Sequence, residues 1–304
     1  MVSKYKNIII GISITIITII TIMENKILHQ RRKVYSVAYA KINLILNVES
    51  KLESGFNKIR TLFSEIDLYD SLKYSLTKKS SIEVWSDREE LCGRENLIYK
   101  VAEYLKNRYC VKSGVYIELY KRIPLAAGLG GGSSDAANAI KSLNLLWDLN
   151  LSKAELHDVA ARFGSDINFF LEGGTACGFN RGEVIERVED VNIKNILLVN
   201  PNIGISSGEA YSLIKDRRKN KNFESYLQTG DIHYLFNDLQ GGIFKKYPLV
   251  EDIVEELTKL GAEFAQMSGS GSTCYGIFST REILEEAESF FRSRGYWVNI
   301  TKTI

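Results

Sequence analysis

The feature that most restricts the fold is a glycine-rich loop between a predicted strand and a predicted helix. Residues 114–123, GVYIELYKRI, alternate Val115, Ile117 and Leu119 with polar or aromatic side chains, which is typical of a strand with one buried face. The glycine-rich loop follows at once, and the helix-forming segment DAANAIKSLNLLW follows the loop. Such a junction makes an anion site, because unpaired backbone amides and the helix dipole both favour a phosphate.

The predicted phosphate-binding loop is PLAAGLGGGSS, that is Pro124, Leu125, Ala126, Ala127, Gly128, Leu129, Gly130, Gly131, Gly132, Ser133 and Ser134. A plain turn needs one or two glycines, whereas this segment has four, so we favour phosphate binding. The loop lacks the Gly-Lys-Ser/Thr ending of strand-loop-helix NTPases, and Ser133 stands where the dinucleotide fingerprint needs its third glycine. Absence of HRD and DFG motifs excludes a eukaryotic-type protein kinase.

The composition is that of a globular protein, with 45% apolar and 25% charged residues and three prolines in 304 residues. This length predicts two domains. A net charge of +2 gives no general field for nucleic acid, so we expect no nucleic-acid partner. The four cysteines and three histidines are scattered, which disfavours zinc, a disulfide scaffold and a Ser-His-Asp hydrolase.

The N-terminus carries the uncharged run NIIIGISITIITIITIM at residues 7–23, flanked by basic residues. Its length of about 17 residues is the short limit for a membrane span, and no small-residue cleavage site follows. Two interpretations stay open: a weak membrane anchor, or a segment outside the fold, which is either sequence upstream of a true translation start at Met23 or a loosely attached tail. Either one leaves the main body cytoplasmic, since the larger basic cluster follows the run.

Hydrophobic periodicity predicts the remaining elements. The predicted strands are 34–48, 61–72, 82–86 and 196–199, together with strands in 267–278 and 296–304 around an intervening helix. The predicted helices are 95–109, 152–163, 207–214 and 249–260, and the glycine loop opens a further helix from Ser134. Ser152 and Glu155 form a predicted capping box. We expect residues 215–223, KDRRKNKNF, to be a solvated loop.

The segment PLAAGLGGGSSDAANAI closely resembles the second motif of the GHMP kinases, small-molecule kinases named for galactose, homoserine, mevalonate and phosphomevalonate. AKINLIL (40–46), GSDINFFLEGGTACGFNRGE (164–183), PNIGISSGEAY (201–211) and MSGSGSTCYGIF (267–278) resemble, in order, the motifs of one branch of this family. The resemblance implies an α+β fold of two domains, the first like ribosomal protein S5 domain 2 and the second ferredoxin-like. It implies an N-terminal extension at 1–33, an ATP-binding domain at 34–185 and a substrate domain at 186–304.

The resemblance also implies the activity. Members of this branch use ATP to phosphorylate the 2-hydroxyl of a cytidine diphosphate-linked methylerythritol, in the non-mevalonate route to isoprenoid precursors. ATP and Mg²⁺ are therefore the expected cofactors, although the sequence shows no dedicated metal cage. Monomer and homodimer both stay open.

Lys41 and Asp166 match the catalytic pair of the family. Asp166 suits a general base for the hydroxyl, and the ammonium of Lys41 suits stabilisation of the transferring group. The implied substrate contacts are Asn43 with the methylerythritol, Phe56 and Tyr211 stacked on the cytosine, Asn57 with the base, and a second glycine loop, Gly269, Ser270 and Gly271, with the diphosphate.

Two departures from the branch bear on these roles. The branch usually has Asp-Gly-Tyr-His where this chain has Ser-Gly-Phe-Asn at 54–57, so Asn57 replaces a histidine at the expected base site. Gly-Ser-Asp-Ile-Asn at 164–168 replaces Gly-Ala-Asp-Val-Pro and keeps the acid. The alternatives are another GHMP kinase, for homoserine, mevalonate or a sugar, or an inactive nucleotide-binding regulator of the same fold. The AKIN and GSD segments disfavour the first, and retention of Lys41 with Asp166 disfavours the second.

Overall fold

A computed structural model describes residues 33–215, 217 and 220–304. Its strands are β1 (Lys33–Lys51), β2 (Asn57–Thr77), β3 (Ile82–Ser86), β4 (Gly114–Tyr120), β5 (Thr175–Asn180), β6 (Val184–Arg187), β7 (Ile196–Asn200), β8 (Phe236–Asn237), β9 (Phe264–Met267), β10 (Cys274–Ile277) and β11 (Trp297–Thr301). Its α-helices are α2 (Leu97–Arg108), α3 (Gly131–Leu146), α4 (Lys153–Ala161), α5 (Ile167–Glu172), α6 (Ser207–Ser212), α7 (Asn222–Thr229), α8 (Gln240–Lys246), α9 (Pro248–Lys259) and α10 (Arg281–Ser293). Short 3-10 turns are η1 (Glu89–Leu91) and η2 (Ile232–Tyr234).

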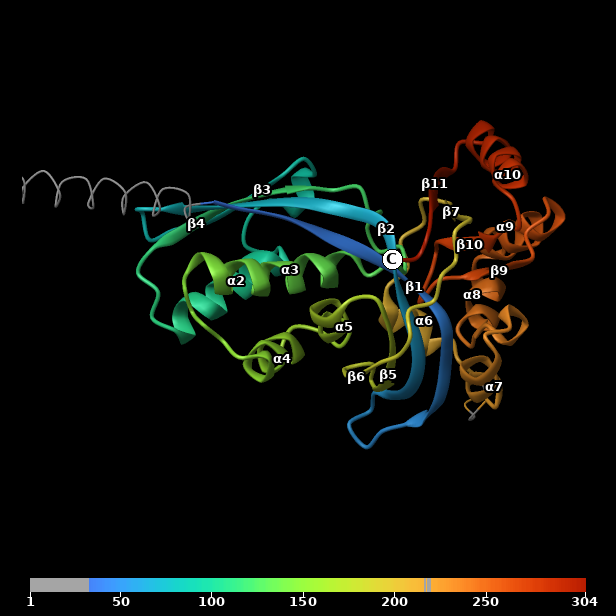
Figure 1. The fold of residues 1–304 in the computed structure, drawn as a ribbon, viewed down its shortest axis with the longest axis horizontal. Coiled ribbons are helices and arrows are strands. Elements are labelled where there is room, and N and C mark those ends of the chain that lie inside the picture. Colours follow the sequence, from blue (N-terminus) through green and yellow to red (C-terminus); the bar gives the residue numbers. More distant parts are fainter. Residues whose placement is uncertain (1–32, 216, 218–219) are drawn as a thin grey trace, which may run out of the picture.

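The first sheet has the order β3-β4-β2-β1-β8, and β5 pairs with both β2 and β6. Helices α2 and α3 lie along one face of its long strands (Figure 1). Side chains of β1 alternate between buried and exposed only near its start, where the opposite sheet face is open and Tyr35 is 70% exposed. From Ala40 to Val48 every residue of β1 is buried, because both faces of the strand are covered there.

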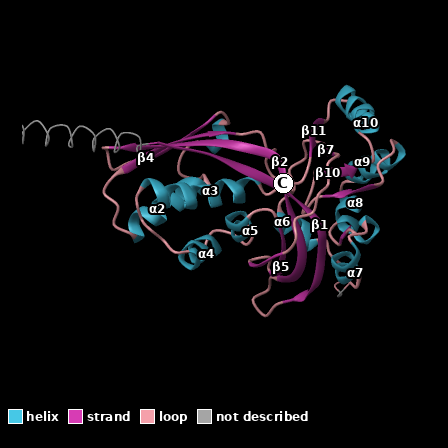
Figure 2. Ribbon diagram, in the orientation of Figure 1, coloured by secondary structure: helices cyan, strands magenta, loops and turns pink. Residues whose placement is uncertain are grey.

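The second sheet is antiparallel with the order β11-β7-β10-β9, and it carries α9 and α10 (Figure 2). The two halves share a hydrophobic core in which Ile42 and Leu44 of β1 pack with Ile196 and Leu198 of β7 and with Tyr275 of β10. The short strand β8 also pairs in parallel with β1, through Ile45 and Leu46. The predicted division at residues 185 and 186 falls within β6 and stays a prediction.

The register of β1 against β2 shifts after Tyr39 and again between Asn43 and Ile45. Bulges of this kind bend a strand and change the direction of the side chains beside them. Lys41 lies on β1 between these two shifts. The bend therefore sets where the Lys41 side chain points.

Most predicted elements are present, and the Ser152/Glu155 capping box is confirmed. Two expectations were wrong. Helix α3 begins at Gly131, not Ser134, with Gly130 as a left-handed N-cap. Residues 215–223 are not wholly a solvated loop, because α7 starts at Asn222 and Phe223 is buried with its ring centroid 6.5 Å from that of Phe179.

Across the described part of the chain, none of the helices is long and apolar enough to cross a membrane. The apolar run at 7–23, for which a membrane anchor or an upstream tail was expected, lies outside the described residues.

Candidate active site

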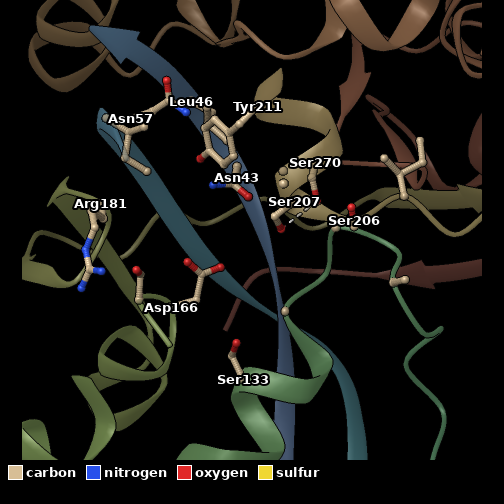
Figure 3. Close-up of a pocket in the computed structure, with 18 of the residues that line it drawn as sticks. Asn43, Leu46, Asn57, Ser133, Asp166, Arg181, Ser206, Ser207, Tyr211 and Ser270 are labelled. Atoms are coloured by element: carbon tan, nitrogen blue, oxygen red, sulfur yellow. Dashed lines mark hydrogen bonds between the residues drawn. The ribbon is translucent and has the colours of Figure 1, made fainter. Parts of the chain in front are cut away.

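A cavity of about 970 Å³ opens where β1, the first glycine loop, α5 and α6 meet. Of the predicted site residues, its lining includes Lys41, Asn43, Phe56, Asn57, Ala126, Ala127, Gly128, Gly130, Gly131, Gly132, Ser133, Asp166, Tyr211, Gly269 and Ser270. Figure 3 shows Asp166 between Ser133 on one side and Asn57 and Tyr211 on the other. One cavity thus brings together segments that lie far apart in the sequence.

Lys41 is 3% exposed and held in place by three contacts. Its Nζ donates to the carbonyl oxygen of Gly128 at 3.0 Å and to Asn43 Oδ1, and it lies 5.6 Å from the centroid of the Phe63 ring. Burial lowers the pKa of Lys41, while the negative charge of Asp166 acts in the opposite direction. Lys41 is therefore a buried lysine whose charged form is opposed by burial and favoured by the carboxylate of Asp166.

Asp166 occupies the N-cap position of α5, but its side chain makes no hydrogen bond to that helix. The carboxylate lines the cavity instead. A Cβ added at Gly182, which has φ +101°, would lie 3.7 Å from Asp166 Oδ1, so the turn between β5 and β6 lies beside this carboxylate. Burial, and then the charge of Asp166, raise the pKa of the Tyr211 phenol, which places Tyr211 within electrostatic range of the same carboxylate.

The first glycine loop needs glycine at two positions for steric reasons. Gly128 has φ +75° and Gly130 has φ +71°, and L side chains avoid this region. A Cβ at Gly128 would lie 2.1 Å from the carbonyl oxygen of Ser268, and a Cβ at Gly130 would lie 2.7 Å from the Phe170 ring. The loop therefore folds tightly against its neighbours and presents its backbone to the cavity at the N-terminus of α3.

The predicted loop is broader than the part that reaches the cavity. Pro124, Leu125, Leu129 and Ser134 do not line it, and Leu129 and Ser134 are buried in the protein. The second glycine loop reaches the cavity through Gly269 and Ser270 but not through Gly271.

Asn237 holds this second loop in position. Its Nδ2 donates to the carbonyl oxygens of Met267 and Gly269, both at 2.8 Å. A Cβ added at Gly269, which has φ +55°, would lie 2.9 Å from both Gly128 O and Lys41 Nζ. The two glycine loops therefore meet at Lys41.

The other end of the cavity holds the predicted base-binding residues. Phe56 is 56% exposed, and the guanidinium carbon of Arg181 lies 4.9 Å from the centroid of its ring. Asn57 Oδ1 accepts a hydrogen bond from Arg217 Nε at 3.1 Å. Tyr211 comes from α6, whose N-cap Ser206 also lines the cavity. Aromatic and amide groups suited to a planar heterocycle thus gather at this end.

Asn43 lines the cavity, and its expected contact with the methylerythritol stays a prediction. Its Oδ1 receives Lys41 Nζ, and its Nδ2 donates to Thr61 Oγ1 at 2.7 Å. Both ends of the amide are thus engaged with the protein, and in this arrangement Asn43 orients Lys41.

Sequence reasoning missed the other lining residues of this cavity: Leu46, Lys51, Gly55, Ile59, Phe63, Leu97, Ser165, Arg181, Ile205, Ser206, Ser207, Gly208, Ser212 and Arg217. The RGE and SSGEAY motifs contained a signal for Arg181, Ser206 and Ser207. Arg217 had none, because its charged segment is typical of a solvated loop.

Within the described ranges, no cluster of three or more His, Cys, Asp or Glu side chains is arranged to hold a metal ion. In the cavity lining, Asp166 supplies the carboxylate. A single carboxylate fits a magnesium ion that keeps several waters and is held mainly by nucleotide phosphates.

Comparison with known proteins agrees with this geometry. Sequence profiles described as the GHMP kinases N terminal domain and GHMP kinases C terminal match residues 96–174 and 220–296. A 4-diphosphocytidyl-2-C-methyl-D-erythritol kinase of Thermoanaerobacter pseudethanolicus is 41% identical over 90% of this chain and 97% of its own length. A protein of the same name from Acetivibrio thermocellus is 35% identical over 88% of this chain and 98% of its own length.

Solved structures of kinases also match this chain. A crystal structure of 4-(cytidine 5'-diphospho)-2C-methyl-D-erythritol kinase matches with a TM-score of 0.76 and 28% identity, over 89% of this chain and all of the other. A homoserine kinase from Cytophaga hutchinsonii shares the fold, with a TM-score of 0.67 and 15% identity over 90% of this chain and 95% of its own. The predicted α+β GHMP kinase fold is therefore confirmed. The chain belongs to the GHMP kinase family, and within it to the 4-diphosphocytidyl-2-C-methyl-D-erythritol kinases, which are ATP-dependent small-molecule kinases.

Proposed function

We propose that this chain transfers the γ-phosphoryl group of ATP to the 2-hydroxyl of 4-diphosphocytidyl-2-C-methyl-D-erythritol, in the non-mevalonate route to isoprenoid precursors. The observation that carries the proposal is the single cavity that combines a phosphate loop, the Lys41 and Asp166 pair and an aromatic end. Sequence relatives that cover nearly the whole chain carry the name of this kinase, which supports the same substrate.

The residues divide the work of phosphoryl transfer. Backbone amides at Gly130 and Gly131, at the N-terminus of α3, hold the ATP phosphates. Asp166 accepts the proton of the attacking hydroxyl, and Lys41 stabilises negative charge on the transferring group. Asn43 and the Gly128 carbonyl keep the ammonium of Lys41 in place. Mg²⁺ would be held mainly by the ATP phosphates, with the Asp166 carboxylate beside it, and would supply further charge neutralisation.

The base-binding end accounts for selectivity toward cytidine. Phe56 and Tyr211 stack on the two faces of the cytosine, and Arg181 packs against the Phe56 ring. Because Asn57 Oδ1 accepts from Arg217, the Nδ2 group of Asn57 is turned away from that arginine and donates to an acceptor atom of the base. Asn57 thus takes over the role of the missing histidine.

The test is steady-state kinetics with a panel of alcohols and an Asp166→Asn variant. We expect the cytidine-linked substrate to react fastest, ahead of homoserine, mevalonate and sugars. In the variant, turnover should fall by about 10² to 10⁴ while ATP affinity barely changes, because general base catalysis is lost. Asp158→Asn, a change at an exposed aspartate of α4, is the matched control and should have parental turnover.

Two results would contradict the proposal. Parental turnover in a folded Asp166→Asn protein would remove Asp166 from catalysis. Faster turnover of another alcohol would leave a GHMP kinase with a different substrate.

We also propose a cytoplasmic main body that acts on small molecules as a monomer or homodimer and binds no nucleic acid. The support is the near-neutral charge and the polar, phosphorylated nature of both substrates. Fractionation of cells that express the full chain tests the location, and sedimentation tests the oligomeric state.

A further inference from the structure

A buried cluster of one lysine and two carboxylates lies beneath the first glycine loop. Lys121 Nζ donates to Asp135 Oδ2 at 2.7 Å and to Asp70 Oδ2, and all three side chains are at most 5% exposed. Asp70 Oδ1 accepts from the backbone N–H groups of Arg122 at 2.6 Å and Ile123 at 3.0 Å. The cluster therefore ties β2 to the chain that enters the loop and to the second turn of α3.

The hydrogen bonds in this cluster are unequal. Both oxygens of Asp70 have partners, whereas Asp135 Oδ1 is buried and has no hydrogen-bond partner in the described part of the chain. With both carboxylates ionised, the cluster carries a net charge of −1, since Lys121 supplies one positive charge. A buried carboxylate oxygen without a donor favours the protonated form, because the neutral acid loses less solvation on burial.

The groups that face Asp135 come from several elements. Asp70 and the Tyr74 phenol lie on β2, Lys121 follows β4, and on β1 the stem of Lys41 passes Gly130 at the start of α3. Tyr74 Oη donates to Asn138 Oδ1 at 2.9 Å, so its proton is engaged there. Burial raises the pKa of Asp135 to about 7, with Lys121 lowering it and Asp70 raising it. Lys121 stays charged, because the two carboxylates raise its pKa although burial opposes them.

The cluster lies directly under the predicted phosphate site. A Cβ added at Gly131 would be 3.2 Å from Lys121 Nζ, and Gly131, Gly132 and Ser133 line the cavity. Phosphates bound to these residues bring several negative charges close to the Asp135 carboxylate. Like charges at short range disfavour the ionised form of a carboxyl group.

We propose that Asp135 takes up a proton when ATP binds, so that nucleotide affinity in this kinase is linked to pH. The proposal rests on the proposed function in that ATP phosphates occupy the first glycine loop. The proton comes from solvent and adds to the Asp135 carboxylate, Lys121 keeps its own proton, and the cluster changes from −1 to neutral. The folded, free enzyme holds this proton below about pH 7, so affinity is highest there and falls as the pH rises.

The experiment is calorimetric titration of the full chain with the magnesium complex of a non-hydrolysable ATP analogue, AMP-PNP. Measurements at pH 7.5 in two buffers of different ionisation enthalpy give the number of protons taken up. We expect the parent to take up a larger fraction of a proton per nucleotide than Asp135→Asn, which cannot titrate. From pH 6.5 to 8.5 the parental Kd should rise about sixfold more than the Kd of the variant, which is the effect expected if bound ATP raises the pKa of Asp135 from about 7 by about one. Asp158→Asn should behave as the parent.

Equal proton uptake and equal pH dependence in the parent and Asp135→Asn would overturn the proposal. If Asp135→Asn does not fold, titration of the parent protein alone tests the proposal. An absence of proton uptake between pH 6.5 and 8.5, after correction for protonation of the free nucleotide, would refute the proposal. The titration needs no second substrate. It therefore stays valid whichever alcohol accepts the phosphoryl group, whereas failure of the parent to bind the analogue at any pH would refute the kinase function itself.

Discussion

Gly128→Ala tests whether the contact between the two glycine loops positions Lys41. The added Cβ would lie 2.1 Å from Ser268 O and 2.9 Å from Gly271 N, far inside van der Waals contact, so the loops must separate. Separation breaks the hydrogen bonds that Gly128 O accepts from Lys41 Nζ at 3.0 Å and from Ser268 Oγ at 3.1 Å. The left-handed backbone adds about 1 to 2 kcal/mol, and the total cost is about 3 to 6 kcal/mol.

The free-energy cost of Gly128→Ala should appear partly as lower stability of the fold and partly as slower turnover. Loss of the bond to the Lys41 ammonium, worth about 1.5 to 3 kcal/mol, should lower turnover about ten- to hundredfold. The rest should appear as a lower melting temperature. A coupled ADP-release assay and thermal unfolding measure the two parts separately. The matched control is Gly241→Ala on α8, where a Cβ meets nothing within 4 Å, and it should leave turnover unchanged and stability equal or slightly higher.

A folded Gly128→Ala protein with parental turnover and melting temperature would refute this reasoning. It would mean that the loops separate without cost and that Lys41 does not depend on the Gly128 carbonyl.

Three further predictions concern other parts of the molecule. Burial raises the pKa of Glu65, although the hydrogen bond from the Gly174 N–H opposes this. The protonated side chain therefore contributes to stability at low pH, and this contribution is lost as the pH rises from about 4.5 through the pKa of the folded protein. Glu65→Gln should therefore melt above the parent at pH 8 and close to it at pH 4, and a difference independent of pH would contradict this. Phe56→Ala and Tyr211→Ala should each lose about 1 to 3 kcal/mol of stacking, seen as a higher KM for the cytidine substrate with the ATP constant unchanged. An unchanged KM in both would show that these rings do not bind the base. A chain that starts at Met23 should keep full turnover, because the described lining of the cavity begins at Lys41, and loss of activity would show that the removed segment supports the fold.

Local signals explain what the sequence could predict. The alternation in β4, the glycines with positive φ and the Ser152/Glu155 capping box each depend on neighbours within a few residues, and all three were recognised. The start of α3 was placed too late, because glycine is a poor helix former and its helical use at Gly131 depends on tertiary contacts.

Long-range contacts explain what was missed. Lys121 forms an ion pair with Asp70, which lies 51 residues away in the sequence, because β2 pairs with β4. No local sequence pattern predicts such a contact. Arg217 reaches Asn57 across 160 residues from a segment whose composition resembles a loop. The engagement of the Asn43 amide by Lys41 and Thr61 likewise depends on strand register.

The bent strand β1 limits how this enzyme can acquire new specificity. Lys41 and Leu46 both line the cavity and lie on the same strand, which pairs with β2 on one side and with β8 on the other. The two halves of the molecule are therefore not separable modules, and we expect that exchanging one of them with a relative would disturb the register shifts on either side of Lys41. Changes in the acceptor should instead accumulate in the turn before β2, at the start of α6 and in the charged segment that contains Arg217, where side chains reach the cavity without disturbing the strand.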